Sequence, residues 1–297
     1  MQLKELTTER RNRATANLDR MTSIELVTAM NREDAVVPRA IKRVLPDIAR
    51  AVDVIAHCLG KGGRLIYVGT GTSGRIGALD ASECPPTFGT KPEMVQFLIA
   101  GGESALVRAT ESSEDSAELG RADMAAKRPS KRDVVVGLAA SGRTPYTIGA
   151  LEYAASKGAA TIAVACNHGS ALARAAKLRI EAEVGAEVLA GSSRLKAGTA
   201  QKLICNMLTT GAMARLGYVY SNLMVNLHLK NEKLLERGIL ILESLAEVDR
   251  DRAVRVLEKA GMSVPVALVM LKANVSKTEA ARRLRKANGN VRKAIEG

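Results

Sequence analysis

Hydrophobic residues form five short runs between positions 64 and 184, and each run predicts a buried β-strand. The runs are RLIYVGTG (64–71), MVQFLIAGG (94–102), DVVVGLAASG (133–142), TIAVACN (161–167) and LRIEAEV (178–184). Segments with helical spacing separate them, and continuous apolar strands that alternate with helices are typical of a parallel sheet covered on both faces. The pattern therefore predicts an α/β fold built on a doubly wound, five-stranded parallel sheet.

Helical patterns flank this sheet on both sides. Residues 1–60 carry apolar side chains three and four positions apart, which predicts a helical lead-in. The last 55 or so residues are rich in Ala, Leu, Lys and Arg and predict a small bundle of three helices. We therefore expect a helical N-terminal segment (1–54), an α/β domain (55–235) and a small helical C-terminal domain (240–297).

The net charge of +13, from 44 Lys or Arg and 31 Asp or Glu, raises nucleic acid as a partner. Residues 250–297 hold twelve of the basic and four of the acidic residues, so more than half of the excess belongs to this segment. Aromatic residues make up only 2% of the chain and Trp is absent, which leaves little material for stacking on bases. We do not expect nucleic acid as a partner.

The sequence also bears on compartment and metal content. No run of about 18 apolar residues occurs and the stretch MQLKELTTERRNR is charged, so we expect no membrane span, no secretory signal and a cytoplasmic protein. The four cysteines lack CxxC spacing and the three histidines lie far apart, so we expect neither a disulfide framework nor a metal site.

The first predicted strand runs into Gly69-Thr70-Gly71-Thr72-Ser73-Gly74-Arg75, which matches the GxGxxG pattern of dinucleotide-binding loops. The dinucleotide-binding pattern requires an acidic residue about 20 positions further on, at the end of the second strand. Here the acidic residue at the end of that strand is Glu103, 34 residues past Gly69. Arg75 also replaces the Lys-Ser/Thr pair of a Walker A loop. Three hydroxyls in the loop suit a phosphate monoester better than a dinucleotide.

The third strand ends in a similar loop, Ala140-Ser141-Gly142-Arg143-Thr144-Pro145, which also opens a helix. Two such loops on adjacent strands can converge on one phosphate, because helix N-termini attract anions. The candidate phosphate-binding residues are Gly71, Thr72, Ser73, Gly74, Ser141, Gly142 and Thr144. The alternative is that these residues only cap helices and form tight turns.

Two glutamates, one after the first predicted strand and one after the second, are candidates for proton transfer. Glu83 lies in DASECPPTFG (80–89), where a double proline predicts a rigid turn that ends the first helix, and Glu114 lies in or before the helix after the second strand. We expect both to face the phosphate-binding cleft. Because a lone glutamate is usually a solvated surface residue, spacing by itself leaves their role open.

Several stretches closely resemble one enzyme family over essentially the whole chain. They are LTTERRN (6–12), LIYVGTGTSGRIGALDASECPPTFG (65–89), VVVGLAASGRTPY (134–146), VGAEVLAGSSRLKAGTAQK (184–202), SNLMVN (221–226) and NEKL (231–234). The family is that of the N-acetylmuramic acid 6-phosphate etherases, which have the sugar isomerase (SIS) fold. The related glucokinase regulatory protein shares GSSRLKAGTAQ, whereas DASECPP favours the enzyme.

This resemblance implies a lyase that removes D-lactate from N-acetylmuramic acid 6-phosphate and yields N-acetylglucosamine 6-phosphate during recycling of cell-wall sugars. In the ring-opened sugar the C3 ether is β to the C1 aldehyde, so removal of the C2 proton expels lactate, and water then adds at C3. By position, Glu83 resembles the acid that protonates the lactyl oxygen and later activates water. Glu114 resembles the residue for C2 proton removal or ring opening, and no metal or cofactor is implied.

The resemblance also implies a homodimer and further substrate contacts. Four residues after the fifth strand are implied to line the cleft: Ser192, Ser193, Arg194 and Lys196. A Lys or Arg there would bind the lactyl carboxylate, unless this helix start is simply exposed to solvent. Asn231 and Lys233 of the NEKL stretch are implied to reach a neighbouring subunit's site.

Two other functions stay open. An SIS-fold sugar phosphate isomerase would also open a ring and shift a C2 proton, but it would expel no C3 substituent. A non-catalytic sugar phosphate sensor would bind without turnover, and residues 276–285 with 290–295 resemble a helix-turn-helix pair. They equally resemble a small ubiquitin-associated (UBA)-like fold, and we expect this segment to serve packing.

Overall fold

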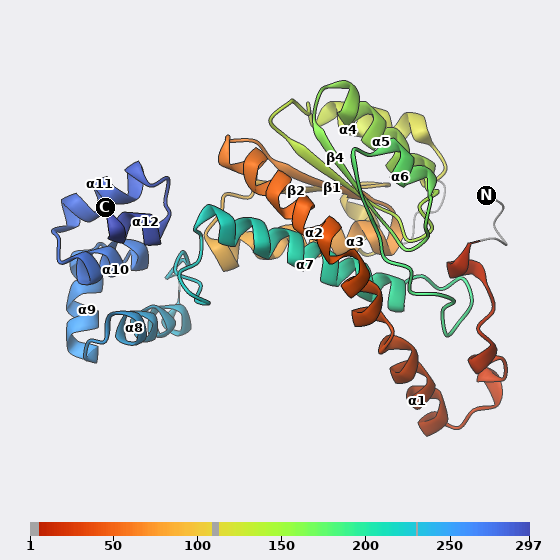
Figure 1. Ribbon diagram of the computed structural model, residues 1–297, viewed down its shortest axis with the longest axis horizontal. Helices are drawn as coiled ribbons and strands as arrows, with labels where there is room; N and C mark the ends of the chain where they lie inside the picture. Colours follow the sequence, from red (N-terminus) through yellow and green to blue (C-terminus); the bar gives the residue numbers. More distant parts are fainter. Residues whose placement is uncertain (1–5, 109–112, 230) are drawn as a thin grey trace. The chain divides into compact units, whose positions relative to one another are not determined.

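A computed structural model describes residues 6–108, 113–229 and 231–297 (Figure 1). Five parallel strands form one sheet in the order β2-β1-β3-β4-β5. Their bounds are Leu65–Gly69 (β1), Val95–Ile99 (β2), Val134–Leu138 (β3), Ala160–Ala165 (β4) and Leu178–Glu181 (β5). The predicted five-stranded parallel α/β fold is confirmed, and so is the expectation that the strands preceding the two loops are neighbours.

Helices cover both faces of the sheet (Figure 1). They are α2 (Val37–Gly60), α3 (Gly71–Phe88), α4 (Ala117–Ala126), α5 (Pro145–Ser156), α6 (Ala171–Ala175) and α7 (Lys196–Leu216). On one face, residues of α4, α5 and α6 share a buried apolar cluster with Ile66 and Val68 of β1, while Tyr67 points to the other face, towards α3 and α7. Every residue of β1 and β3 is buried, which explains their continuous apolar runs.

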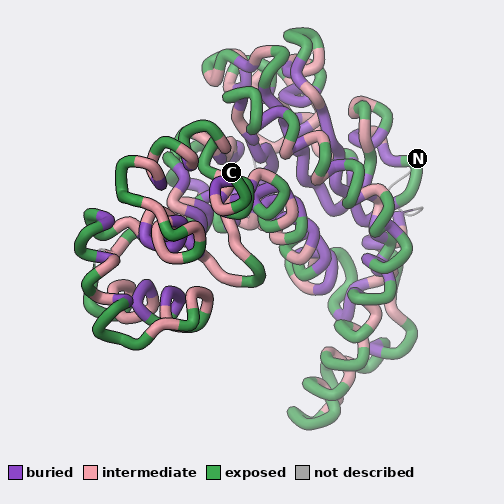
Figure 2. The backbone as a smooth tube through the Cα atoms, turned by 60° about the vertical axis from the view of Figure 1, so that its left-hand side comes forward, coloured by how far each residue is buried: buried purple, intermediate pink, exposed green. Residues whose placement is uncertain are grey.

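The N-terminal lead-in is helical, as predicted. After three short 3₁₀ turns, α1 (Ser23–Asp34) begins with a capping box in which Thr22 N–H donates to Glu25 Oε2 at 2.8 Å. Pro46 lies inside α2 and does not end it. Helix α1 has no buried residue in the single chain, and its tube is green and pink in Figure 2.

The double proline departs from expectation. Pro85 and Pro86 lie within the last turn of α3, which continues to Phe88, so they do not form a turn after the helix. Each proline lacks a backbone N–H and so removes one hydrogen bond to the carbonyl four residues earlier in the helix. The chain leaves the helix at Gly89, which has φ +65° and whose N–H still donates to the Pro85 carbonyl at 2.9 Å.

Two compact units are distinguished within the chain, Met1–Ser82 with Pro92–Thr209, and Glu83–Lys91 with Thr210–Gly297. The second contains α8 (Glu232–Ala246), α9 (Arg250–Lys259), α10 (Val264–Ala273), α11 (Lys277–Lys286) and α12 (Val291–Glu296). Four helices begin at or after Arg250, so the prediction of three was wrong. Left-handed residues, Gly261 (φ +71°) and Asn274 (φ +50°), interrupt the helical run after α9 and α10.

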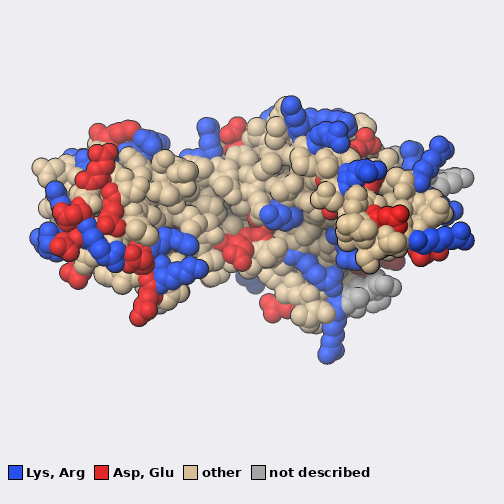
Figure 3. Space-filling view, turned by 90° about the horizontal axis from the view of Figure 1, so that it is seen from below, with Lys and Arg blue, Asp and Glu red and all other residues tan. Residues whose placement is uncertain are grey.

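The basic residues of these C-terminal helices are partly paired with acids. Arg250 binds Glu236 at 2.6 Å, and Glu279 accepts from both Arg282 and Arg283. Figure 3 shows Lys and Arg intermingled with Asp and Glu on the visible face. Among the described residues, no helix is both long and apolar enough to cross a membrane.

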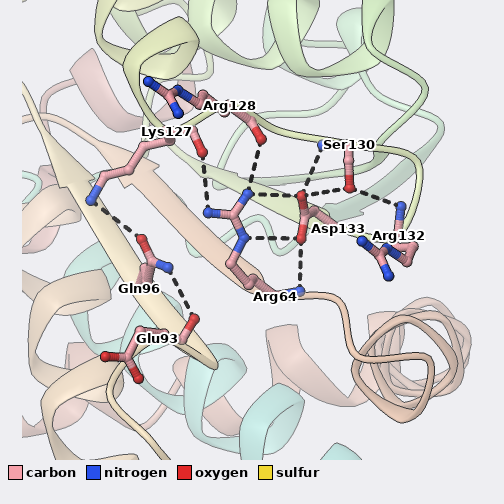
Figure 4. Close-up of polar contacts among 8 residues, drawn as sticks. All are labelled: Arg64, Glu93, Gln96, Lys127, Arg128, Ser130, Arg132 and Asp133. Atoms are coloured by element: carbon pink, nitrogen blue, oxygen red, sulfur yellow. Dashed lines mark hydrogen bonds and ion pairs between the residues drawn. The ribbon is translucent and has the colours of Figure 1, made fainter.

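An ion pair joins β1 to β3 at the amino-terminal edge of the sheet (Figure 4). Asp133 accepts from the Arg64 guanidinium at 2.9 Å and from the backbone N–H groups of Arg64 and Ser130, each at 2.8 Å. Burial would raise the pKa of the Asp133 carboxyl, but hydrogen bonds from Arg64 and Ser130 outweigh it and hold that pKa below its usual value.

Candidate functional site

A polar cavity of about 250 Å³ lies at the carboxyl ends of β1 and β3. Its lining residues are Thr8, Glu9, Thr70, Gly71, Thr72, Ser73, Glu114, Ala139, Ala140, Ser141, Thr144 and Ser193. Because β1 and β3 are paired, the loops that follow them lie side by side. The carboxyl edge of a doubly wound sheet is where such folds bind ligands.

The first loop presents Gly71, Thr72 and Ser73 to the cavity at the N-terminus of α3. Gly71 has φ +48°, a conformation that favours glycine. Gly74 does not line the cavity. A side-chain carbon at Gly74 would lie 2.6 Å from Cγ1 of Ile99, so this glycine allows α3 to pack closely on β2.

The second loop presents Ser141 and Thr144 at the N-terminus of α5. Thr144 is the N-cap residue, but its side chain makes no capping hydrogen bond, so capping does not account for its hydroxyl. Gly142, also predicted to bind phosphate, does not line the cavity; it has φ +67°, and a side-chain carbon there would come within 2.3 Å of Ser170 Cβ. Pro145 occupies the first turn of α5, as predicted.

Glu114 reaches the cavity from the segment before α4. Its Oε1 lies 3.3 Å from the position that a Gly71 side-chain carbon would occupy, so the carboxylate stands directly over the first loop. The Glu114 carbonyl accepts from Tyr146 N–H at 3.1 Å, which ties this segment to the start of α5. The structure therefore places one predicted catalytic carboxylate between the two hydroxyl-bearing loops.

Glu83 does not line this cavity. It is exposed on α3, twelve residues after Gly71, which corresponds to about 18 Å along a helix axis. Leu79, one turn earlier on the same face of the helix, is 51% exposed. Within a single chain, the expectation that both glutamates face the cleft is not met.

The segment after β5 contributes less than expected. Ser193 lines the cavity, whereas Ser192 and Arg194 do not, and Arg194 is exposed. Lys196 is buried at the start of α7, where its Nζ forms an ion pair with Glu33 of α1. The expected role of Lys196 in carboxylate binding therefore conflicts with its observed partner.

Asn231 and Lys233 lie in the other compact unit. Asn231 caps α8, because its Oδ1 accepts from Leu234 N–H at 2.9 Å. Lys233 is exposed in the first turn of that helix. These positions assign a structural role to Asn231 and leave both residues outside the lining of the cavity.

Thr8 and Glu9 of the N-terminal motif LTTERRN had no predicted function, and both line the cavity. Asn167, which follows β4, holds this segment: Thr7 N–H and hydroxyl donate to its Oδ1, and its Nδ2 donates to Thr8 Oγ1 at 3.1 Å. Glu9 Oε2 then lies 3.4 Å from the position of a Gly191 side-chain carbon. Only the quoted motif pointed to this segment.

The assembled site has two chemical halves. Hydroxyls and helix N-termini suit a phosphate monoester, because they offer hydrogen-bond donors and positive dipole ends. The carboxylates of Glu9 and Glu114 suit the hydroxyl and proton-transfer chemistry of a polar carbon skeleton attached to that phosphate.

Two family models match the chain. Residues 47–155 match the glucokinase regulatory protein N-terminal SIS domain, and residues 116–211 match the SIS domain. The phosphoheptose isomerase of Francisella tularensis aligns with a TM-score of 0.53 at 20% identity, over 65% of this chain and 100% of that chain. This likeness shows the shared fold.

Relatives of closely similar length share about half of their residues with this chain. It is 52% identical over 295 residues to N-acetylmuramic acid 6-phosphate etherase 2 of Lactiplantibacillus plantarum, covering 99% of this chain and 100% of that protein. Identity to the N-acetylmuramic acid 6-phosphate etherase of Oenococcus oeni is 52%, covering 99% of each. Identity to the Klebsiella aerogenes enzyme of that name is 51%, covering 99% of this chain and 98% of that protein. The chain therefore belongs to the N-acetylmuramic acid 6-phosphate etherase family.

Proposed function

We propose that this protein cleaves the C3 lactyl ether of N-acetylmuramic acid 6-phosphate and yields N-acetylglucosamine 6-phosphate and D-lactate. Family membership supports the reaction, and one observation supports the site: two hydroxyl-bearing loops and Glu114 line the same cavity. The loops bind the 6-phosphate through Thr72, Ser73, Ser141 and Thr144, together with the N–H groups at the start of α3.

The reaction proceeds by elimination and addition. Ring opening exposes a C1 aldehyde, which acidifies the C2 proton, and Glu114 accepts that proton. The electron pair forms a C2–C3 double bond conjugated with the aldehyde, and the C3–O bond breaks. An acid protonates the departing lactyl oxygen. Water then adds at C3, the proton returns to C2, and no metal or redox cofactor is required.

The departing oxygen needs an acid, and Glu83 fills this role if a second copy supplies it. Glu83 is exposed about 18 Å along α3 from the first loop, and the same helix face exposes Leu79. An exposed leucine beside the glutamate suits a surface that a second subunit covers. We therefore propose a homodimer in which each subunit's Glu83 completes the partner's cavity.

Mixing two inactive variants tests this arrangement. In a random mixture of E83A and E114A subunits, half of the dimers are mixed, and each mixed dimer has one site with both glutamates. Activity should therefore return to about a quarter of the wild-type value. If both glutamates act within one chain, mixing restores nothing and the shared-site proposal is wrong.

Turnover in water carrying heavy oxygen tests the reaction itself. The label should enter C3 of N-acetylglucosamine 6-phosphate and be absent from the ether-derived hydroxyl oxygen of lactate. An SIS-fold isomerase would release no lactate, and a regulatory sensor would bind the sugar phosphate without turnover. Either outcome would reject the proposed lyase.

We place the reaction in the cytoplasm. All four cysteines are buried free thiols, which fits a reducing compartment. Measuring the enzyme's activity in cytoplasmic and secreted fractions of its native cells tests this location.

A further inference from the structure

Ser73, a candidate phosphate ligand, is hydrogen bonded to a buried glutamine that lies within the stretch VGAEVLAGSSRLKAGTAQK (184–202) but was given no predicted role. Its hydroxyl donates to Gln201 Oε1 at 2.9 Å. Gln201 lies on α7, close to one turn after Gly198, where a side-chain carbon would lie 3.5 Å from Thr72 Cγ2. This face of α7 therefore packs against the beginning of α3, directly behind the first phosphate loop.

The other half of the Gln201 amide lacks a partner. The Gln201 side chain is fully buried, and its Nε2 makes no hydrogen bond with any residue that the structure describes. A buried N–H donor without an acceptor is rare in proteins, whereas a carbonyl oxygen without a donor is somewhat more common. An unsatisfied donor therefore lies next to Ser73, one of the hydroxyls that line the cavity.

Rotating the amide by 180° exchanges its donor and acceptor with little change of shape. In the rotated orientation Nε2 donates to Ser73 Oγ, and the Ser73 proton is released from Gln201. That proton can then donate to a phosphate oxygen in the cavity, which Ser73 lines. The occupied site gains a chain of two hydrogen bonds in place of one, and the buried donor is satisfied.

We propose that Gln201 is a positioning residue whose amide reverses when phosphate enters, turning the Ser73 hydroxyl towards the ligand. The inference rests on the proposed phosphate site and adds a residue outside the cavity lining. The reversed arrangement favours a ligand group that only accepts hydrogen bonds. A phosphate monoester offers only acceptors, so it is bound best in the reversed arrangement. The hydroxyl of an unphosphorylated sugar can also donate to Ser73, and it therefore gains less from the reversal.

Selective labelling of glutamine side chains with heavy nitrogen makes the amide directly observable by nuclear magnetic resonance. The sequence contains only Gln2, Gln96 and Gln201, and the Q2A and Q96A variants assign the signals by elimination. Gln96 already donates to the Glu93 carbonyl at 2.9 Å on the surface and serves as an internal control. Titration of the full chain with inorganic phosphate should shift the Gln201 amide protons downfield and leave those of Gln96 in place.

Calorimetry on the same samples measures phosphate binding directly, and so tests the phosphate site separately from the reversal of the Gln201 amide. If phosphate binds but the Gln201 signal stays unchanged, the amide reversal is wrong and the phosphate site stands. If phosphate does not bind at millimolar concentration, both the reversal and the phosphate site are wrong.

A double-mutant cycle tests whether Gln201 acts through Ser73. Q201M and S73A should each weaken phosphate binding about fivefold or more, and the double variant should bind within about twofold of S73A. Q201M should raise KM for the sugar phosphate with kcat within about threefold of wild type, a split that general loosening of the fold would not give. Full additivity of the two substitutions would overturn the proposal.

Thr147→Val provides a matched control. Thr147 Oγ1 is also buried without a partner among the described residues, but it lies on α5 outside the cavity lining. T147V should leave phosphate affinity unchanged. A loss equal to that in Q201M would show that any buried change perturbs the cavity and would also reject the specific role.

Discussion

Thr7 donates twice to the same oxygen, Oδ1 of Asn167, once through its backbone N–H and once through its hydroxyl, each at 2.8 Å. The two residues are 160 positions apart. Asn167 also donates to Thr8 and to the Ala140 carbonyl, each at 3.1 Å. One buried side chain thus joins the N-terminal segment to the second hydroxyl-bearing loop.

Replacing Asn167 with Ala should destabilise the protein by about 2 kcal/mol or more, because buried partners lose their hydrogen bonds. It should also raise KM for the sugar phosphate, since Thr8 and Glu9 lose their anchor. Urea unfolding and steady-state kinetics measure the two effects. Asn12→Ala is the control, because Asn12 lies in the same N-terminal segment but its hydrogen-bond partners, Ala14 and Ala186, do not line the cavity. An equal rise in KM for both variants would contradict the anchoring role.

Glu114→Gln should lower lactate release by about a hundredfold or more and abolish exchange of the C2 hydrogen with deuterated water. Glu83→Gln should also block lactate release but retain C2 exchange, because only the departing oxygen loses its proton donor. Glu118→Gln alters a nearby exposed carboxylate on α4 and should leave both rates unchanged. Retained C2 exchange in E114Q would remove Glu114 from the base role.

Exhaustive treatment with a strong chelator should leave the rate of lactate release unchanged. The proposed proton transfers use carboxylates alone, and the phosphate is bound by hydroxyls and backbone N–H groups. Activity is measured before and after dialysis against chelator. A loss that one divalent ion reverses would contradict the metal-free mechanism.

Asp133→Asn should lower the free energy of unfolding by about 3 kcal/mol at pH 7, because it leaves the Arg64 charge without its buried partner. The folded-state pKa of Asp133 is depressed, so its stabilisation is present above the unfolded value near 3.9 and is lost as pH falls through the lower folded value. The difference between wild type and D133N should therefore shrink below about pH 4.

Asp47→Asn provides the comparison for D133N. Asp47 pairs with Arg50, whose side chain is 66% exposed, so this substitution should cost less than about 1 kcal/mol at any pH. Urea unfolding across the acid range measures both variants. A constant difference for D133N down to pH 2 would show that its cost does not come from the ionised carboxylate.

The sheet was predictable because its strands are buried on both faces and therefore appear as unbroken apolar runs. The two hydroxyl-bearing loops were recognisable because each directly follows such a run, and the pairing of β1 with β3 brings them together. Local sequence was sufficient in both cases, since strand, loop and helix start are contiguous.

Contacts between distant parts of the chain were not predictable in this way. The sequence places Lys196 at the start of a helix, where its charge could bind a substrate carboxylate. In the folded chain, tertiary packing buries Lys196 against Glu33. Gln201 lies in a quoted family stretch and Asn167 in none, but neither received a predicted role, because their importance depends on which residues the fold places beside them. The position of Glu83 was not predictable for a different reason: residue spacing along one chain does not reveal whether a second copy of the chain completes the site.

The ion pair of Arg64 with Asp133 and the cavity occupy opposite rims of one sheet. Durability and chemistry can therefore be engineered separately. Substitutions that strengthen the contacts around Arg64 would raise thermal stability without changing the reaction. Redesign of the loops at the opposite edge of the sheet would change substrate preference while the strands keep their register. A protein engineer could screen separate libraries for stability and for substrate preference and then combine the best variants of each.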